Sequence, residues 1–324
     1  MKRYALHAAV IAGLLLLLAT QIDVDETLDA LSDVHPAYLV AGAVLNAPIA
    51  LLFGLRQHLV LRSLGLSLPA RIVYPAAIVG NVAGALTPAA SGDLLRTAVL
   101  RSHADLPVKD GLAIVAYERG LSLFTLAAGT AAAAAWLVLP QPWNVALTVA
   151  CAGLLALPLF GSRILRALPT VGDDRGNAFR RALYRAESVA ERLGELLDDR
   201  ALLLPWFAMT ITILGIATAQ YWLLTRSMSD AVTPLEAWFA FGASQLLAIA
   251  SLLPFGLGIA DASLAAFLRR AGMTLEQGTA VAILVRVTST LPLTLLAVAC
   301  YVYLVRIGKS GDGAALAQEP LNAP

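Results

Sequence analysis

Long apolar runs separated by short polar segments cover most of the chain. Six of these runs approach or exceed the roughly 20 residues that an α-helix needs to cross a bilayer. They are residues 4–20, 36–55, 111–139, 143–161, 201–225 and 279–305. The pattern therefore predicts an all-α integral membrane protein with six transmembrane helices.

Two further apolar runs, 72–87 and 235–253, are each interrupted at a proline and followed by a second, half-apolar segment. The second segments are 91–101 and 261–270. Broken backbone at membrane depth is tolerated where protein or water satisfies the freed polar groups. We therefore expect two re-entrant helical hairpins, each of which enters the membrane and returns to the side from which it came.

The distribution of positive charge favours this topology. The segment 21–35 has five acidic residues and no Lys or Arg, whereas 56–71 has three arginines and 162–200 has eight. Arg and Lys stay on the cytoplasmic side. If the segment 72–101 returns to its own side, the loops 56–71 and 162–200 are both cytoplasmic.

The same treatment of 235–268 leaves Arg306 and Lys309 on the cytoplasmic side, at the expense of placing Arg269 and Arg270 outside. Both termini are then predicted to be cytoplasmic.

Composition agrees with a membrane protein, since 59% of the residues are hydrophobic and 14% are charged. The net charge of +1 gives no basic field for nucleic acid. Cys151 and Cys300 lie in apolar runs and are interpreted as small buried hydrophobes. The four histidines are scattered, so no metal site is predicted. The first 20 residues resemble a signal peptide, but without a small-residue cleavage site they are interpreted as the first span.

A single polytopic domain is expected over 1–306. Apolar positions at three- and four-residue spacing predict an amphipathic helix at about 173–200, lying at the cytoplasmic interface. The tail 307–324 is rich in Gly, Ala and Pro and is expected to be disordered.

The two halves of the domain, 1–139 and 143–306, match in order. Aligning Pro88 with Pro254 places Gly92 on Gly258 and brings Arg119 within one residue of Arg286. Three predicted spans separate the hairpins, so the hairpins enter from opposite faces. This is an inverted-topology repeat, and Gly/Pro-interrupted segments at matching positions indicate the central site of a transporter.

Six ionisable residues fall within or beside these apolar segments, where a charge is costly and generally functional. Arginine is the natural phosphate ligand among them, because its planar fork binds two oxygens at once. The predicted substrate-binding residues are Asp93, Arg96, Glu118, Arg119, Asp261 and Arg286. The predicted break residues are Pro88, Gly92, Pro254, Gly256 and Gly258. Structural ion pairs that hold the hairpins together are an alternative role for the charges.

The residues around these charges carry a family resemblance. The segments PAASGDLLRTAVL and AYERGLS, and later LLPFGLGIADASLAAFLRRAGM and AILVRVTSTLP, resemble the lysylphosphatidylglycerol synthase transmembrane region, a flippase-like membrane domain family. The family pattern has Glu where this chain has Asp93 and Asp261, and a glycine where it has Ala89 and Phe255. The resemblance extends over about residues 5 to 306 and implies translocation of lipids between leaflets, without the aminoacyl-transfer domain of the bifunctional relatives.

The function expected is therefore that of a lipid flippase which moves an anionic or phosphate-bearing lipid, such as an aminoacyl-phospholipid or a polyprenyl-phosphate-linked lipid. It is expected not to be an enzyme and to need no cofactor, and membrane lipids are its expected partners. Twenty arginines against three lysines suggest a GC-rich bacterial genome, and hence the bacterial cytoplasmic membrane. A homo-oligomer is left open. Two alternatives remain: a membrane enzyme acting on a lipid phosphate, and a non-transporting scaffold.

Overall fold

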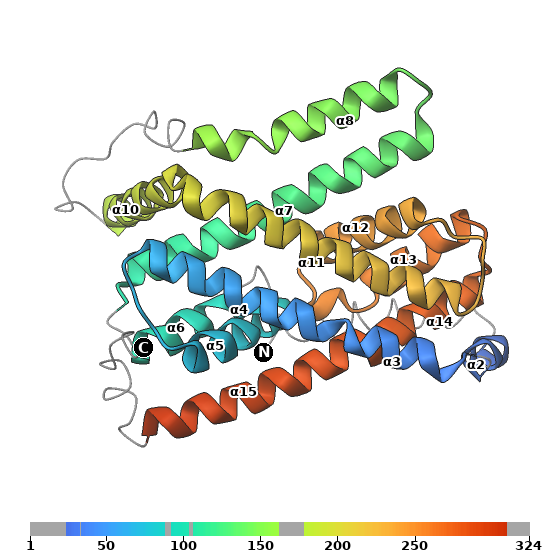
Figure 1. Ribbon diagram of the computed structural model, residues 1–324, viewed down its shortest axis with the longest axis horizontal. Coiled ribbons are helices and arrows are strands. Elements are labelled where there is room, and N and C mark those ends of the chain that lie inside the picture. The colour runs from blue at the N-terminus through green and yellow to red at the C-terminus, as the bar shows by residue number, and fades with distance from the viewer. Residues whose placement is uncertain (1–23, 33, 88–91, 104–105, 162–177, 310–324) are drawn as a thin grey trace, which may run out of the picture.

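The computed structural model describes residues 24–32, 34–87, 92–103, 106–161 and 178–309. Within these ranges the regular elements are all helices, and no strand occurs. The longest helices run side by side along the long axis of the molecule, which is horizontal in Figure 1. The predicted all-α class is confirmed.

Four continuous helical stretches are long and apolar enough to cross a membrane: Pro36–Ser63, Val108–Val138, Arg200–Arg226 and Leu275–Ile307. The first joins α3 (Pro36–Val44) to α4 (Asn46–Ser63), and the second and third are α7 and α11. The fourth joins α14 (Leu275–Val285) through the π-helical turn η4 (Arg286–Thr290) to α15 (Leu291–Lys309). At a rise of 1.5 Å per residue, each exceeds the roughly 30 Å hydrocarbon core. The chain is thus a multi-pass membrane protein.

The other two predicted spans have different outcomes. Residues 4–20 lie outside the described part of the chain. In place of a span over 143–161, the structure has the 12-residue helix α8 (Trp143–Leu154) and a 3₁₀ turn, η2 (Leu157–Phe160). Helix α8 lies along α7 (Figure 1). Its length gives only about 18 Å, so the number of six spans stays a prediction.

The predicted boundary at residue 55 is wrong. Helix α4 continues to Ser63, so the loop expected at 56–71 is confined to 64–69. The extension occurs because Val60 and Leu61 are fully buried in the core, and this packing keeps a mixed polar segment helical. A kink at Leu45 separates α3 from α4.

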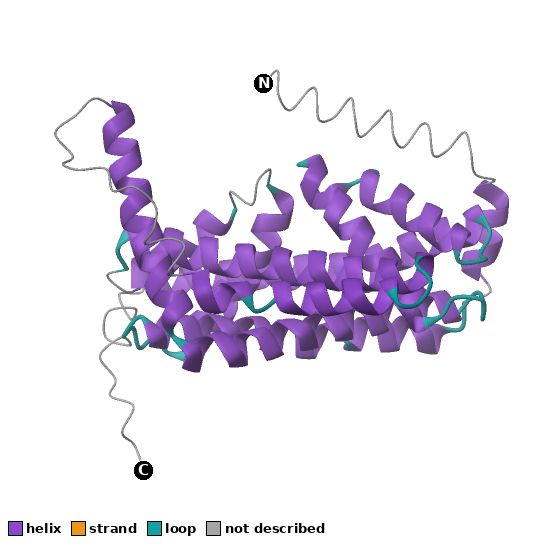
Figure 2. Cartoon of the chain, turned by 90° about the horizontal axis from the view of Figure 1, so that it is seen from above, coloured by secondary structure: helices purple, strands orange, loops and turns teal. Residues whose placement is uncertain are grey.

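Two helical hairpins are present where broken runs were predicted. The first hairpin consists of α5 (Ala70–Leu86) and α6 (Asp93–His103). The second consists of α12 (Pro234–Ser251), the short turn η3 (Pro254–Gly256) and α13 (Ile259–Arg270). The hairpins extend from opposite ends of the bundle, and Figure 2 shows both on the same side of the long helices, with the facing ends of their helices near mid-length. Each helix is shorter than the roughly 30 Å hydrocarbon core, and the re-entrant course of the two hairpins stays a prediction.

Buried apolar side chains form two main clusters, one around each hairpin. The first cluster includes Ile72 of α5, Tyr117 of α7 and Trp206 of α11. The second includes Leu224 of α11 and Leu268 of α13. The middle of the bundle, between the two clusters, is where the polar site lies.

Three smaller predictions can be compared with the structure. The acidic segment 21–35, expected as a loop, contains the helix α2 (Val24–Ser32), whose first turn holds Asp25 and Glu26, a favourable place for negative charge. A helix, α10 (Ala178–Asp198), lies within the segment 173–200 and packs against α7 and α11, and its position at the cytoplasmic interface stays a prediction. Helix α15 continues to Lys309, so 307–309 are not part of a tail, and 310–324 lie outside the described residues.

Candidate functional site

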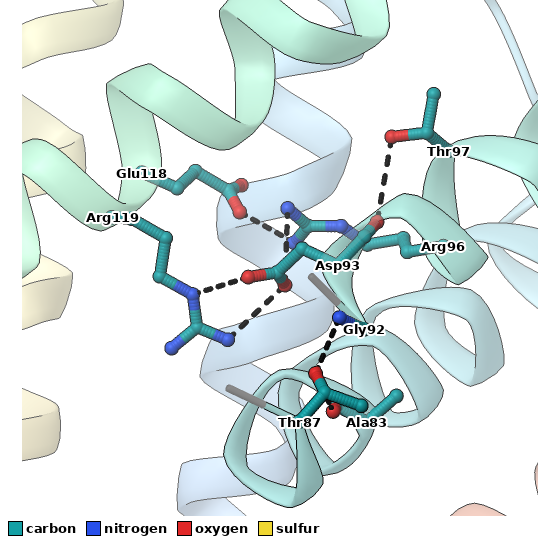
Figure 3. Close-up of polar contacts among 8 residues, drawn as sticks. All are labelled: Ala83, Thr87, Gly92, Asp93, Arg96, Thr97, Glu118 and Arg119. Carbon is teal, nitrogen blue, oxygen red and sulfur yellow. Dashed lines mark hydrogen bonds and ion pairs between the residues drawn. The ribbon is translucent and has the colours of Figure 1, made fainter. Parts of the chain in front are cut away.

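The first element of the site is an ion pair between Asp93, the first residue of α6, and Arg119 of α7. The guanidinium donates from Nε to Oδ2 at 2.5 Å and from Nη2 to Oδ1 at 3.1 Å. Figure 3 shows the two side chains meeting end to end. The Asp93 side chain is 1% exposed and that of Arg119 is 40% exposed. A two-bond contact of this kind fixes both the distance and the orientation of the pair.

A second ion pair lies beside the first. Arg96 donates from Nη1 to Oε2 of Glu118 at 2.5 Å, and both side chains are 6% exposed. Nη2 of Arg96 also lies 3.8 Å from Oδ1 of Asp93. The two pairs therefore form one network that joins α6 of the hairpin to α7 (Figure 3).

Glycines on α5 allow this network to form. A methyl group on Gly84 would lie 2.2 Å from Nη2 of Arg119, and one on Gly80 would lie 2.6 Å from Cβ of Arg96. At the turn, the backbone N–H of Gly92 donates to Oγ1 of Thr87 at 2.5 Å. A Cβ at Gly92 would lie 2.0 Å from the carbonyl oxygen of Ala83, so only glycine fits there.

The second hairpin has a matching ion pair. Arg286, at the start of η4, donates from Nε to Oδ1 of Asp261 at 2.9 Å and from Nη2 to Oδ2 at 3.1 Å. Nη2 also donates to the carbonyl oxygen of Phe255 at 3.2 Å, and Oδ2 accepts from the backbone N–H of Gly258 at 3.1 Å. The arginine therefore binds both the second helix of the hairpin and the turn that precedes it.

The two ion pairs have the same construction. In each, an aspartate in the first turn of the second hairpin helix pairs through two bonds with an arginine on a following long helix, 26 residues later in the first hairpin and 25 in the second. This agrees with the predicted alignment of Arg119 with Arg286. The second ion pair of the first hairpin has no such counterpart. Leu264 stands three residues after Asp261, where the first hairpin has Arg96, and Val285 stands before Arg286, where it has Glu118.

The backbone at the turns explains the choice of break residues. In the second hairpin, Gly256 and Gly258 have φ values of 61° and 82°, which glycine adopts without strain. Pro254 begins the turn η3, where its fixed φ is suited to a first helical position. Pro88, predicted as the break in the first hairpin, lies outside the described residues.

Two adjoining cavities open between the hairpins, with volumes of about 350 and 540 Å³. Asp93, Arg96 and Glu118 line the first, and Asp261 and Arg286 line the second. Arg119 lines both. The structure thus brings all six predicted charged residues to one connected polar region. Uncharged polar side chains also line it: Asn81, Thr87, Ser122, Thr210, Gln220, Ser244, Gln245, Ser289, Thr290 and Thr294.

One charged residue of the region was missed in the sequence. Arg56 was assigned to a cytoplasmic loop, but it lies in α4, is 8% exposed and lines the first cavity. Its Nη1 donates to Oγ1 of Thr210 at 3.1 Å, and its guanidinium carbon lies 4.6 Å from the ring centroid of Trp206. The sequence offered one signal that Arg56 lies on a buried helix face: the apolar residue Val60 stands four positions later, on the same face of a helix.

Every one of the six predicted charged residues takes part in an ion pair. These pairs hold each hairpin against a long helix, so a structural role is part of what these residues do. The described residues contain no group of three or more His, Cys, Asp and Glu side chains that could hold a metal ion.

Comparison with known proteins agrees with this architecture. Residues 4–297 match the family described as the lysylphosphatidylglycerol synthase TM region, and the chain belongs to this family. It is also similar to the glycosyltransferase AglD of Haloferax volcanii, with 31% identity over 131 residues. That match covers 39% of this chain and 21% of the Haloferax protein, so only about a fifth of that relative is matched. The resemblance inferred from the hairpin motifs is confirmed.

Proposed function

We propose that this protein is a lipid translocase that moves an anionic or phosphate-bearing lipid between leaflets and catalyses no covalent chemistry. The observation that carries the proposal is the pair of adjoining cavities between two helical hairpins, lined by arginines at mid-length of the bundle. Charged side chains within a membrane are energetically costly and generally functional. A lipid head group is therefore the proposed occupant of this chamber. An aminoacyl-phospholipid or a polyprenyl-phosphate-linked lipid has the required chemistry.

The proposed topology has six transmembrane helices, two re-entrant hairpins in an inverted repeat, and both termini in the cytoplasm of a bacterial cell. The short loop 64–69, between Arg62 and Arg71, supports a cytoplasmic position for the end from which the first hairpin extends. The aspartate–arginine pair that occurs in each hairpin supports the proposal that the two halves of the chain are structural repeats.

In the proposed cycle, a head group enters the chamber from one leaflet while the acyl chains stay in the bilayer. Its phosphate is stabilised by guanidinium groups that line both cavities, with Arg119 between them. The hairpins then rock against each other and open the chamber to the other side. The glycine contacts at the turns allow the close approach that such movement needs.

The energy source follows from what the sequence contains. The printed sequence has no G-x-x-x-x-G-K-[ST] motif for binding nucleotide phosphates. The proposed driving force is therefore the lipid gradient or a coupled ion. Asp93, Glu118 and Asp261 are the carboxylates that would carry a proton.

The test is lipid scrambling in proteoliposomes that contain fluorescent phosphatidylglycerol, with dithionite quenching as the measure of flipping. The double variant Arg119→Ala/Arg286→Ala is expected to abolish the protein-dependent rate. Arg226→Ala is the control, because Arg226 is half-exposed at the end of α11 and pairs with Asp230 outside both cavities. Unchanged scrambling in a folded double variant would remove these arginines from the function.

The name of the archaeal relative favours a second candidate, transfer of a glycosyl group to a membrane lipid. The small share of that protein that is matched makes it the weaker of the two. Purified protein incubated with a radiolabelled polyprenyl phosphate and nucleotide sugars would form a glycosylated product only under this second candidate.

A further inference from the structure

The charged lining of the two cavities is unbalanced. Among the described residues, four arginines and three carboxylates line them. Arg96, Arg119 and Arg286 each bind a carboxylate through an ion pair. The fourth arginine, Arg56, forms no ion pair with any described residue; Glu118 attracts it through space but is itself bound by Arg96.

The groups in direct contact with Arg56 are neutral, although Glu118, Arg96 and Arg119 lie near enough to act on it through space. Nη1 donates to the hydroxyl of Thr210, and the guanidinium faces the rings of Trp206 at 4.6 Å and Phe53 at 5.5 Å. Its Nε is buried and has no hydrogen-bond partner. Aromatic faces attract a cation but do not neutralise it. The side chain is therefore held firmly in place while its charge is left available.

The burial of Arg56 distinguishes it from an arginine that extends to the membrane surface. It lies seven residues before Ser63, the end of α4, which is roughly 10 Å along the helix. An arginine close to a helix end extends to the membrane surface, where water solvates it. Arg56 instead lines the first cavity and is only 8% exposed.

Resting on the lipid-transport function proposed above, we infer that Arg56 is the primary anion-binding residue of the chamber and that its ligand is a phosphate group. The three paired arginines are already neutralised by carboxylates, and a phosphate can bind them only in competition with Asp93, Glu118 or Asp261. No described carboxylate is bound to Arg56, so a phosphate displaces none there, and the fork of its guanidinium matches two phosphate oxygens. The hydroxyl of Thr210, which holds Nη1, positions this fork.

The phosphate can belong to a lipid head group or be free inorganic phosphate, and a binding experiment separates these sources. The full chain is purified in a maltoside detergent and its midpoint of thermal unfolding is titrated with three probes. The probes are phosphatidylglycerol, inorganic phosphate, and a neutral galactolipid that lacks phosphate. Phosphatidylglycerol is expected to stabilise the wild-type protein in a saturable manner and the galactolipid is not. Equal stabilisation by inorganic phosphate would identify a free-phosphate site on the same residue.

The variant Arg56→Gln is expected to weaken the apparent affinity for phosphatidylglycerol by at least about ten-fold, as loss of a charge-assisted contact predicts. Arg226→Gln is the matched control, because Arg226 also lies over a tryptophan ring, that of Trp222 at 5.8 Å, but outside both cavities. It is expected to bind as the wild type does. If Arg56→Gln does not fold, Arg56→Lys keeps the charge without the fork and is expected to show an intermediate loss.

Undiminished binding of phosphatidylglycerol by Arg56→Gln, or no stabilisation of the wild type by either phosphate probe, would overturn the inference. The result is separable from the transport proposal. If phosphatidylglycerol binding depends on Arg56 but the protein scrambles no lipid, the anion site is supported and the transport proposal is rejected. Scrambling that is unaffected in Arg56→Gln would retain transport and reject the site.

Discussion

The side-chain amide of Asn46 donates a hydrogen bond of 2.6 Å to the carbonyl oxygen of Thr288, which is 242 residues away in the chain. Asn46 is the first residue after the kink at Leu45, and Thr288 lies within the π-helical turn η4. Oδ1 of the same asparagine accepts from the hydroxyl of Ser289 at 3.2 Å. Two irregular points on neighbouring long helices are therefore joined directly, and η4 is also the turn that presents Arg286.

Replacing Asn46 with leucine is expected to lower the free energy of unfolding by about 1 to 2 kcal/mol, because it leaves the buried carbonyl of Thr288 without its side-chain donor. Ser289→Ala removes only the longer contact and is expected to cost less. Denaturation in mixed detergent micelles measures both. Equal costs for the two variants would show that the amide-to-carbonyl bond is not the stabilising one.

The Asp93–Arg119 pair gives a prediction about coupling. Arg119→Gln leaves the Asp93 carboxylate, 1% exposed, with only the longer contact to Arg96. Breaking a fully buried pair costs several kcal/mol, but Arg119 is 40% exposed, so we expect about 2 kcal/mol. The double variant Asp93→Asn/Arg119→Gln is expected to be less destabilised than the sum of the single variants. A double-mutant cycle on the free energy of unfolding measures this coupling, and strict additivity would contradict it.

Comparison of the two hairpins gives a ranking. The Asp261 side chain is 21% exposed and that of Arg286 is 25% exposed, so water solvates either partner when the other is removed. Arg286→Gln is therefore expected to destabilise the protein less than Arg119→Gln does, despite the additional bond from Arg286 to Phe255. Measuring both variants in the same detergent tests the order, and a reversed order would mean that the bond to the turn outweighs the difference in burial.

Much of this architecture could be predicted from the sequence, because proline breaks and charges in apolar runs are local features. Arg119 and Arg286 were found since each interrupts a hydrophobic helix. Arg56 was missed because hydropathy falls after residue 55, and its burial depends on Trp206 and Thr210 of a helix about 150 positions away. The π-helical turn η4 has no signature in composition, and its neighbours, α3 and Asn46 of α4, are distant in the sequence.

The glycine at position 84 gives a prediction that separates folding from function. A methyl group there would lie 2.2 Å from Nη2 of Arg119, the flexible end of a long side chain that can move aside. Gly84→Ala is therefore expected to fold but to displace the guanidinium from Asp93, lowering lipid scrambling several-fold. Gly215→Ala is the control, since no atom lies within 4 Å of a methyl group there, and a helical alanine is preferred to glycine by up to about 1 kcal/mol. Equal scrambling by both variants would disconnect the geometry of Arg119 from transport.

The proposed re-entrant topology predicts which residues share a side of the membrane. If the first hairpin returns to its own side, Ser67 and Lys109, which precede and follow it and are both exposed, lie on the cytoplasmic face. Ala231, which precedes the second hairpin, and Arg269, in the last turn of α13, are also exposed and then lie on the outer face.

Single cysteines at these four positions, in a chain whose Cys151 and Cys300 are replaced by alanine, can be labelled with a membrane-impermeant maleimide. Ser67→Cys and Lys109→Cys are expected to react in inverted vesicles, and Ala231→Cys and Arg269→Cys on intact cells. A hairpin that crossed the membrane would place its two flanking sites on opposite faces. Such a result for either hairpin would remove the shared chamber, because the charged tips could no longer meet at mid-depth from opposite sides.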